Sequence, residues 1–351
     1  MNKRVLLGMS GGVDSSVSAI LLKEQGYEVT GVTMNLCSDS NCCNLNSMLD
    51  AKNVCKKIGI NHYIVDYKDL FKEKVINNFI SEYKKCRTPN PCIQCNKYLK
   101  FGEIYKKAQE LGIDYIATGH YARIEYSKKY KRNVLKKAKN IEKDQSYVLY
   151  IIPKELLDKI IFPLGNYKSK EEIRKIAKEK EFSVASKPDS EDICFIPDGD
   201  YKKYLEENSN ISRKSGNIVD KDGNILGKHE GLYRYTIGQR KGMGIANTVP
   251  LFVIGFNPDR NELIVGEENK TYKNGMIVKD VNMLAIDKIE KPIEAKVKTR
   301  YSQKEAECTI EMIDENVLEV KFKEPQARIT PGQSAVFYDD DIVICGGIIE
   351  K

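Results

Sequence analysis

The chain has 351 residues, of which 41% are hydrophobic and 30% charged. This length suits two or three domains, and the composition excludes wholesale disorder. Lys and Arg number 57 against 50 Asp and Glu, a net charge of +7 that is compatible with a polyanionic partner. The apolar runs are too short to span a bilayer and no secretory signal pattern opens the chain, so we expect a cytoplasmic protein with no membrane association. The ten cysteines are then expected to be reduced, and to act as ligands, catalysts or small core residues.

Strand and helix patterns alternate over the first 120 residues. Strand patterns lie at residues 3–9, 27–34, 62–67 and 114–120, and helical patterns at 14–26, 45–59, 69–86 and 97–112. Helices of this length between strands predict a parallel sheet that is covered on both faces. Ligands bind such sheets at the carboxyl ends of the strands.

The second half of the chain changes in texture. Ser169 and Glu172 form a capping box that predicts one more helix at 171–182. Beyond about residue 196, Asp/Gly turns separate short β segments, and from about residue 279 alternating patterns dominate. We therefore predict an α/β catalytic domain at residues 1–200, a central β-rich domain at 201–280 and a C-terminal β-barrel at 281–351.

A basic segment lies at residues 123–143. It holds nine Lys or Arg against two Glu. Such a run is either a solvated hairpin or a surface that contacts phosphates, and both interpretations stay open.

The sequence GMSGGVDSS, residues 8–16, follows the first strand pattern and opens the first helical pattern. Gly11 and Gly12 permit a tight turn whose N–H groups are bare to an anion. The helix N-terminus adds partial positive charge, and Ser10, Ser15 and Ser16 are candidate hydroxyl donors. The loop lacks the lysine of a Walker A motif. Asp14, an acid inside an anion site, is explained if it positions Mg²⁺.

The loop SGGVDSS resembles that of the ATP pyrophosphatases. Six further motifs resemble, in this order, those of the tRNA-specific 2-thiouridylase family: RTPNPCIQCNKYLKF, ATGHYAR, KDQSYVLY, SEDICFI, GLYRYTIGQRKGMGI and PGQSAVFY. The resemblance covers nearly the whole chain. It implies a parallel-sheet fold of the adenine-nucleotide α-hydrolase type, followed by a small β domain and a β-barrel.

The resemblance also implies an activity. Such an enzyme uses ATP and Mg²⁺ to adenylate the C2 oxygen of the wobble uridine, anticodon position 34, in tRNAs for Lys, Glu and Gln. Sulfur then replaces that oxygen, giving 2-thiouridine, AMP and pyrophosphate. A cysteine desulfurase or a sulfur-relay protein would be the sulfur donor.

Roles for individual residues follow from the same resemblance. Cys95 would be the nucleophile-type cysteine and Cys194 the persulfide carrier. The residues that would hold ATP are Gly8, Met9, Ser10, Gly11, Gly12, Val13, Asp14, Ser15, Met34 and Gly119. The target base would meet Asn90, Pro91 and Cys92. The tRNA would be contacted by His120, Lys143, Asp144, Gln145, Arg300, Tyr301 and Gln333.

Two cysteines depart from the family pattern. Cys92 stands where many members have Asp, and Cys86 where many have Gly. Cys92, Cys95 and Cys194 together would suffice to hold a [4Fe–4S] cluster with one iron open to hydrosulfide. The alternative route passes through a persulfide and then a disulfide bond. Both routes stay open at this point.

The other cysteines are assigned from their surroundings in the sequence. Cys37, Cys55, Cys308 and Cys345 are predicted to be small buried residues, and Cys42 and Cys43 stay undecided.

Two rival functions remain. One is an ATP pyrophosphatase that makes an amide or amidine, as argininosuccinate synthetase-like proteins do; it would not need Cys95 and Cys194. The other is a non-catalytic RNA-binding protein, against which the intact glycine loop argues. Pyrophosphate release that depends on tRNA would separate the three functions.

Overall fold

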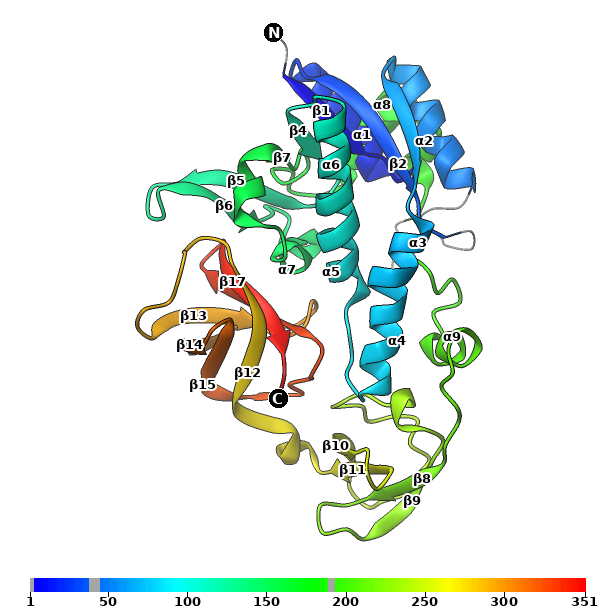
Figure 1. The fold of residues 1–351 in the computed structure, drawn as a ribbon, viewed down its shortest axis with the longest axis vertical. Helices are drawn as coiled ribbons and strands as arrows, with labels where there is room; N and C mark the ends of the chain where they lie inside the picture. The colour runs from blue at the N-terminus through cyan, green and yellow to red at the C-terminus, as the bar shows by residue number, and fades with distance from the viewer. Residues whose placement is uncertain (1–2, 38–44, 189–192) are drawn as a thin grey trace.

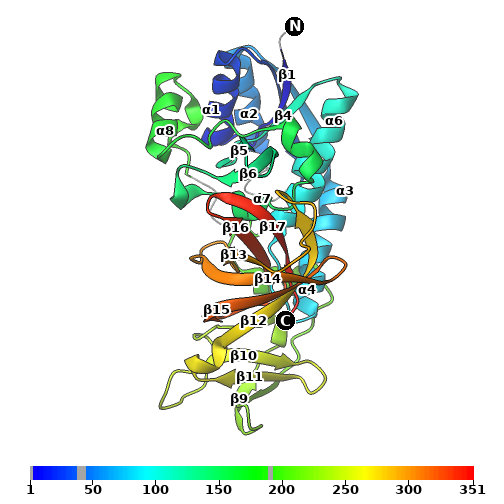
Figure 2. The ribbon, with the colours of Figure 1, turned by 90° about the vertical axis from the view of Figure 1, so that its left-hand side faces the viewer.

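The structure, a computed structural model, describes residues 3–37, 45–188 and 193–351. Cys42 and Cys43 lie outside the described residues. Three units follow one another along the longest axis of the molecule (Figure 1). A parallel-sheet domain lies at one end, a small β domain at the other, and a barrel between them, an arrangement that Figure 2 also shows. Within the described part, no helix is long and apolar enough to cross a membrane.

The first unit is built on a five-stranded parallel sheet of order β3-β2-β1-β4-β7. Its strands are β1 (Arg4–Gly8), β2 (Glu28–Asn35), β3 (Asn61–Asp66), β4 (Tyr115–Ala117) and β7 (Ile160–Ile161). This confirms the predicted parallel sheet. Because β1 is parallel to both of its neighbours, the carboxyl ends of β1, β2 and β4 lie at one edge of the sheet.

Helices cover both faces of this sheet, because residues along a strand point alternately to opposite sides. Val5 and Leu7 pack with α1 (Val13–Glu24), α2 (Leu45–Ile58) and α8 (Lys170–Glu179). Leu6 packs on the other face with α6 (Ile104–Glu110). The capping box of Ser169 and Glu172 is present at the start of α8, as predicted.

The two long helical patterns, 69–86 and 97–112, form composite helices. In the first, α3 (Lys68–Phe71) continues through a π-helical segment into α4 (Asn77–Lys84). In the second, α5 (Pro91–Cys95) continues through the π-helical segment Asn96–Glu103 into α6. Two further short helices are α7 (Ser146–Leu149) and α9 (Tyr201–Asn208).

The two remaining units, the small domain and the barrel, consist mainly of β-strands, as predicted. The small domain has the strand order β10-β11-β8-β9, with β8 (Gly216–Val219), β9 (Ile225–His229), β10 (Phe252–Asn257) and β11 (Glu262–Gly266). The barrel consists of β12 (Tyr272–Met283), β13 (Ile293–Lys298), β14 (Ala306–Asp314), β15 (Val317–Ala327), β16 (Ser334–Asp339) and β17 (Ile342–Ile349). It closes through the pairing of β12 with β17. Since β12 crosses residue 280, we propose that the barrel domain begins at Tyr272.

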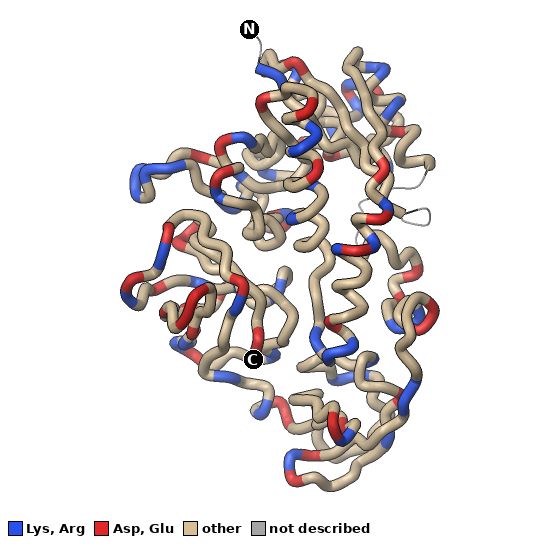
Figure 3. Tube along the Cα trace, in the orientation of Figure 1, with Lys and Arg blue, Asp and Glu red and all other residues tan. Residues whose placement is uncertain are grey.

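The basic segment 123–143 contributes a hairpin, β5 (Ala122–Ser127) and β6 (Arg132–Lys137), whose strand β6 pairs with β17 of the barrel. The sequence did not indicate this junction. Asp341 accepts ion pairs from Arg123 at 2.7 Å and Lys136 at 3.0 Å, and Lys137 pairs with Glu305. Only the tip of the hairpin projects as a basic end (Figure 3). Those three cations therefore hold two domains together, whereas the tip is the part still suited to contact phosphates.

Candidate active site

The glycine loop lies where β1 ends and α1 begins. Gly11 has φ +71°, and a Cβ there would lie 2.1 Å from the carbonyl oxygen of Ser47, so only glycine fits. Gly12 caps α1 without a side-chain hydrogen bond, which leaves the first-turn N–H groups to a ligand or to water. Ser15 and Ser16 are buried, and each donates its hydroxyl proton to the carbonyl oxygen of Gly12, at 3.1 and 2.9 Å. These two hydroxyls therefore shape the turn, and Ser10 alone of the three serines is exposed.

Asp14 is held by two partners from other elements. Lys170, at the first position of α8, places Nζ 2.6 Å from both carboxylate oxygens. The Tyr121 hydroxyl donates to Oδ1 at 2.7 Å. Lys170 is only 8% exposed. Neither partner was predicted. A lysine in the first turn of a helix is unfavourable for the helix dipole, so its presence there could have indicated an interaction with a nearby acidic group.

Gly119 lies beside this loop, and Met34 lies near the carboxyl end of the neighbouring strand β2. A Cβ on Gly119 would come within 3.0 Å of the backbone of Asp14 and Ser15, so the β4 loop and the glycine loop are in close contact. Met34, near the end of β2, packs against two clusters. One contains Leu6 and Val32, and the other contains Cys95.

Cys95 and Cys194 come together in the fold although they are 194 − 95 = 99 positions apart. Cys95, 7% exposed, belongs to a hydrophobic cluster that also holds Phe71, Phe79 and Phe195. Cys194 and Cys37 are partly buried residues packed against the same cluster. Cys37, which directly follows the Leu36 of this cluster, was predicted to be a small buried residue but is only partly buried, because it packs at the edge of the cluster. Three thiols therefore belong to or border one hydrophobic cluster.

Cys92 is placed differently. It is exposed, whereas Cys95, three positions along, is buried. Burial and the charges of Asp144 and Cys92 raise the pKa of Tyr301, a residue of the barrel. In residues 3–37, 45–188 and 193–351, no three His, Cys, Asp or Glu side chains are grouped to hold a metal ion. In this arrangement Cys92, Cys95 and Cys194 do not fit a [4Fe–4S] cluster.

The segment before Cys92 is tied to all three units. Asn90 caps α5 by accepting a hydrogen bond from the N–H of Cys92 at 3.1 Å, and Pro91 is the first helical residue. Thr88 N–H donates to the carbonyl oxygen of Pro331 at 2.9 Å, and the amide of Gln333 donates to the Thr88 carbonyl oxygen at 2.7 Å. The Thr88 hydroxyl also lies 3.3 Å from that of Thr236 in the small β domain. The residues predicted to meet the base thus lie on a segment held by the barrel.

Arg300 and Tyr301 lie in the barrel beside this junction. Arg300 Nη2 donates to the carbonyl oxygen of Ile237 at 3.0 Å and also contacts Thr330 Oγ1. Its Nε is buried and has no hydrogen-bond partner among the described residues. Burial and the nearby charge of Arg328 lower the pKa of Arg300. An unsatisfied guanidinium donor is what a site awaiting an acceptor would present.

The other predicted tRNA contacts are less accessible. His120 is 8% exposed, its Nδ1 lies 2.7 Å from Thr118 Oγ1, and burial lowers its pKa well below the ordinary value. Asp144 is 6% exposed and accepts a hydrogen bond from Ser146 Oγ at 2.7 Å. Gln145 accepts one from Tyr121 N–H at 2.9 Å. Gln145 thus orders the backbone at Tyr121, and Asp144 that at Ala138 and Ser146, while Lys143 is exposed.

Three of the cysteines expected to be core residues are buried. Cys55, Cys308 and Cys345 are at most 1% exposed, and burial raises the pKa of Cys55 and Cys308 to about 12. They are therefore unreactive thiols, as expected.

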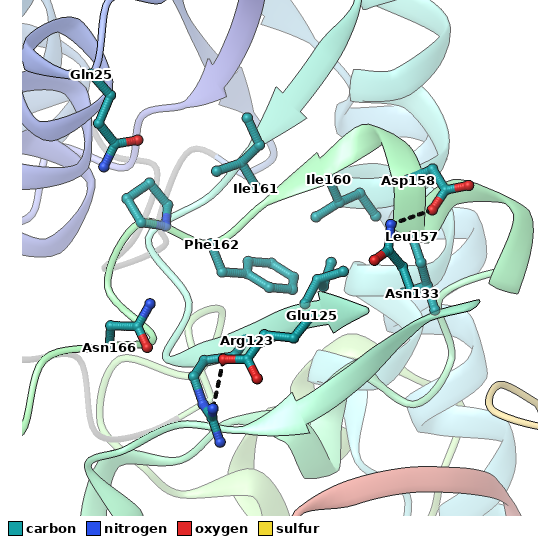
Figure 4. Close-up of a pocket in the computed structure, with 12 residues that line it drawn as sticks. Gln25, Arg123, Glu125, Asn133, Leu157, Asp158, Ile160, Ile161, Phe162 and Asn166 are labelled. Carbon is teal, nitrogen blue, oxygen red and sulfur yellow. Dashed lines mark hydrogen bonds and ion pairs between the residues drawn. The ribbon is translucent and has the colours of Figure 1, made fainter. Parts of the chain in front are cut away.

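A pocket of about 320 Å³ opens between the hairpin and β7, away from every predicted site residue (Figure 4). Four of its polar side chains are already paired, Arg123 with Glu125 at 2.6 Å and Asn133 with Asp158 at 2.7 Å. A second pocket of about 320 Å³ lies in the loop 240–251 of the small β domain. Neither pocket adjoins the glycine loop or the three thiols.

Comparison with known proteins adds three family matches. Residues 3–198 match the tRNA methyl transferase HUP domain, 202–267 the tRNA methyl transferase PRC-barrel domain, and 273–349 the aminomethyltransferase β-barrel domain. The chain is 49% identical over 357 residues to the tRNA-specific 2-thiouridylase MnmA of Acetivibrio thermocellus, covering 99% of both chains. It is 49% identical over 358 residues to the protein of the same name in Clostridioides difficile, covering 100% of this chain and 99% of that one.

Two solved structures are similar at greater distance. One is the U34-tRNA thiolase NcsA of Methanococcus maripaludis with its [4Fe–4S] cluster, at 21% identity and a TM-score of 0.36, covering 60% of this chain and 68% of that chain. The other is a 4-thiouridine synthetase–RNA complex with bound ATP, at 20% identity and a TM-score of 0.39, covering 58% and 50%.

Proposed function

Because the chain belongs to the tRNA-specific 2-thiouridylase family, we propose that it converts the wobble uridine of tRNAs for Lys, Glu and Gln to 2-thiouridine. The full-length relatives guide this proposal, since their match covers the whole chain, whereas each domain description covers one unit. The observation that supports the mechanism is the hydrophobic cluster that contains Cys95 and against which Cys194 and Met34 pack. Since its substrate is tRNA, we expect the enzyme in the cytosol.

The first step consumes ATP. The C2 oxygen of uridine attacks the α-phosphorus, and pyrophosphate leaves. The first-turn N–H groups of α1 and the loop glycines are suited to bind the leaving group. Asp14 would hold Mg²⁺, for which one carboxylate plus phosphates suffices, and the ion would neutralise phosphate charge. AMP on the oxygen makes a leaving group that departs without strong acid.

The second step moves sulfur. A cysteine desulfurase or sulfur-relay protein first leaves a terminal sulfur on Cys194 as a persulfide. That sulfur attacks C2, and AMP departs with the former uracil oxygen. The thiolate of Cys95 then attacks the Sγ of Cys194, which breaks the S–S bond, releases 2-thiouridine and leaves a Cys95–Cys194 disulfide. A dithiol reductant supplies the two electrons that restore both thiols. No step is derived through a [4Fe–4S] cluster, which the arrangement of the three cysteines does not fit.

The test separates adenylation from sulfur transfer. In Cys194→Ser, tRNA-dependent pyrophosphate release in the first turnover should persist while 2-thiouridine is lost. In Asp14→Asn both should be lost with tRNA binding retained. Cys86→Ala, which changes a half-buried thiol in a different cluster, is the control and should keep both activities. Normal 2-thiouridine formation by Cys194→Ser would exclude this route, and tRNA binding without any pyrophosphate release by the unmodified enzyme would favour the non-catalytic alternative.

A further inference from the structure

The glycine loop contains no lysine, although a nucleoside triphosphate brings several negative charges to it. Helix N-termini supply only partial charge, and Walker A loops add a lysine for the β- and γ-phosphates. The hydroxyls of Ser15 and Ser16 are turned toward Gly12 and away from any ligand. A full positive charge must therefore come from another part of the chain.

Two lysines contact the loop in the described part of the structure. Lys187 donates to the carbonyl oxygen of Gly11 at 3.3 Å, and its charge is balanced by Asp50 at 3.1 Å. Lys170 projects from the start of α8, and its Nζ bridges both carboxylate oxygens of Asp14 at the start of α1. Its ammonium group lies over the Tyr121 ring, 5.6 Å from Nζ to the ring centroid. The capping box of Ser169 and Glu172 fixes the backbone from which Lys170 projects.

We propose that Lys170 is the cation that binds the pyrophosphate end of ATP, and that Asp14 holds its ammonium group in the site until the nucleotide arrives. This inference rests on the proposed function. Asp14 would hold the ammonium group before the nucleotide binds and Mg²⁺ afterwards, so the two roles follow one another in time. When its oxygens bind Mg²⁺, the ammonium group would exchange the carboxylate for a phosphate oxygen. The exchange keeps a buried ammonium paired throughout, which burial at 8% exposure demands.

The competing explanation is that Lys170 only neutralises Asp14. The two explanations differ in a double variant. If Lys170 only neutralises, then Lys170→Met combined with Asp14→Asn removes a balanced pair and anion binding is kept. If Lys170 binds the anion itself, the double variant loses affinity relative to Asp14→Asn alone, in which the ammonium is free of its carboxylate.

The experiment measures binding of inorganic pyrophosphate, without Mg²⁺, to the full chain by isothermal titration calorimetry. Charge-assisted hydrogen bonds of the size expected correspond to about 10- to 100-fold in affinity. Asp14→Asn should bind pyrophosphate at least as tightly as the unmodified chain, and the double variant at least tenfold more weakly than Asp14→Asn. A smaller loss overturns the proposal.

Two further variants guard the result. Lys175→Met removes an exposed lysine of the same helix, with a side chain 78% exposed, and should leave the affinity unchanged. Lys170→Arg keeps the charge and should retain binding if Lys170→Met proves unstable; loss of binding in a folded Lys170→Arg variant would contradict the charge-based role. Pyrophosphate that fails to bind the unmodified chain at all would overturn the adenylation step as well, whereas binding that survives in the double variant would overturn only the role of Lys170.

Discussion

The side chain of Arg87 ties the segment before Asn90 to the barrel, and we expect Arg87→Met to lower the stability of both the segment and the barrel. Its Nε donates to Glu82 at 2.7 Å and its Nη1 to Glu350 at 2.6 Å, while Nη2 donates to the Ile349 carbonyl oxygen at 3.2 Å. Arg87 and Glu82 are 17% and 16% exposed, whereas Glu350 is 35% exposed. Methionine keeps most of the stem packing and removes the donors.

The expected decrease in the free energy of unfolding can be estimated from these contacts. The pair with Glu82 is well buried and is worth about 1.5–3 kcal/mol. The pair with Glu350 is partly solvated and is worth about 0.5–1 kcal/mol. The bond to the Ile349 carbonyl oxygen adds about 1 kcal/mol, and rotamer entropy regained by the side chain offsets about as much. We therefore expect unfolding of the barrel to become easier by about 3 kcal/mol.

The assay combines urea unfolding, followed by far-UV circular dichroism, with hydrogen exchange in β17. Exchange is the sharper measurement because several domains unfold in separate transitions. Arg213→Met removes an arginine that also pairs with a glutamate but is 60% exposed, and should leave exchange in β17 unchanged. A loss below about 1 kcal/mol in Arg87→Met would refute the reasoning that burial makes this contact strong.

The same contact predicts a pH dependence. The hydrogen bond from Arg87 is the foremost cause that lowers the pKa of Glu350 below its ordinary value of 4.5. A carboxyl with a lowered folded-state pKa stabilises fully above its unfolded pKa and loses that contribution as the pH falls through the folded value. The difference in stability between the unmodified chain and Arg87→Met should therefore shrink below about pH 4.5, and a difference that grows in acid would contradict the assignment.

Two further predictions concern backbone positions. Cys86 has φ +57°, a left-handed conformation that costs a non-glycine residue about 1–2 kcal/mol; Cys86→Gly should therefore be about 1 kcal/mol more stable in urea than Cys86→Ala, and equal stabilities would remove strain as the reason. Gly119→Ala forces a Cβ to within 3.0 Å of the loop backbone and should weaken ATP binding at least about tenfold. Gly255→Ala, where the atom nearest to the new Cβ lies at 3.5 Å, should leave ATP binding unchanged. Equal ATP affinity in both variants would show that ATP binding does not need the close contact between Gly119 and the glycine loop.

The sequence was sufficient wherever a local pattern determines the structure. Strand–helix alternation predicted the parallel sheet, the Ser169–Glu172 spacing predicted the start of α8, and Gly11 predicted a turn that only glycine allows.

Contacts between distant parts of the chain could not be predicted in this way. Lys170 and Asp14 are 156 positions apart, and no periodicity links them. The basic hairpin was interpreted by its charge alone, yet β6 extends the barrel sheet, because Ile342 offers a strand edge and Asp341 a carboxylate. Charge composition does not state which partner a cation has. The same limit applies to His120, whose burial follows from packing against Phe101 and Phe162.

The arrangement of these contacts bears on why pyrophosphate release should depend on tRNA. Gln333 of the barrel holds the carbonyl oxygen of Thr88, two residues before the cap Asn90 of the helix that carries Cys92 and Cys95. Arg300, with its buried Nε awaiting an acceptor, lies on the same side of this junction. We expect an RNA that binds the barrel at this junction to act on the Thr88 segment and α5 together. Since Cys95 belongs to the cluster against which Met34 packs, we expect a shift of α5 to be passed to β2 through that cluster. We expect tRNA binding to align the base, the nucleotide and the sulfur-bearing cysteine. Without tRNA these groups would not be aligned, so ATP would be protected from hydrolysis.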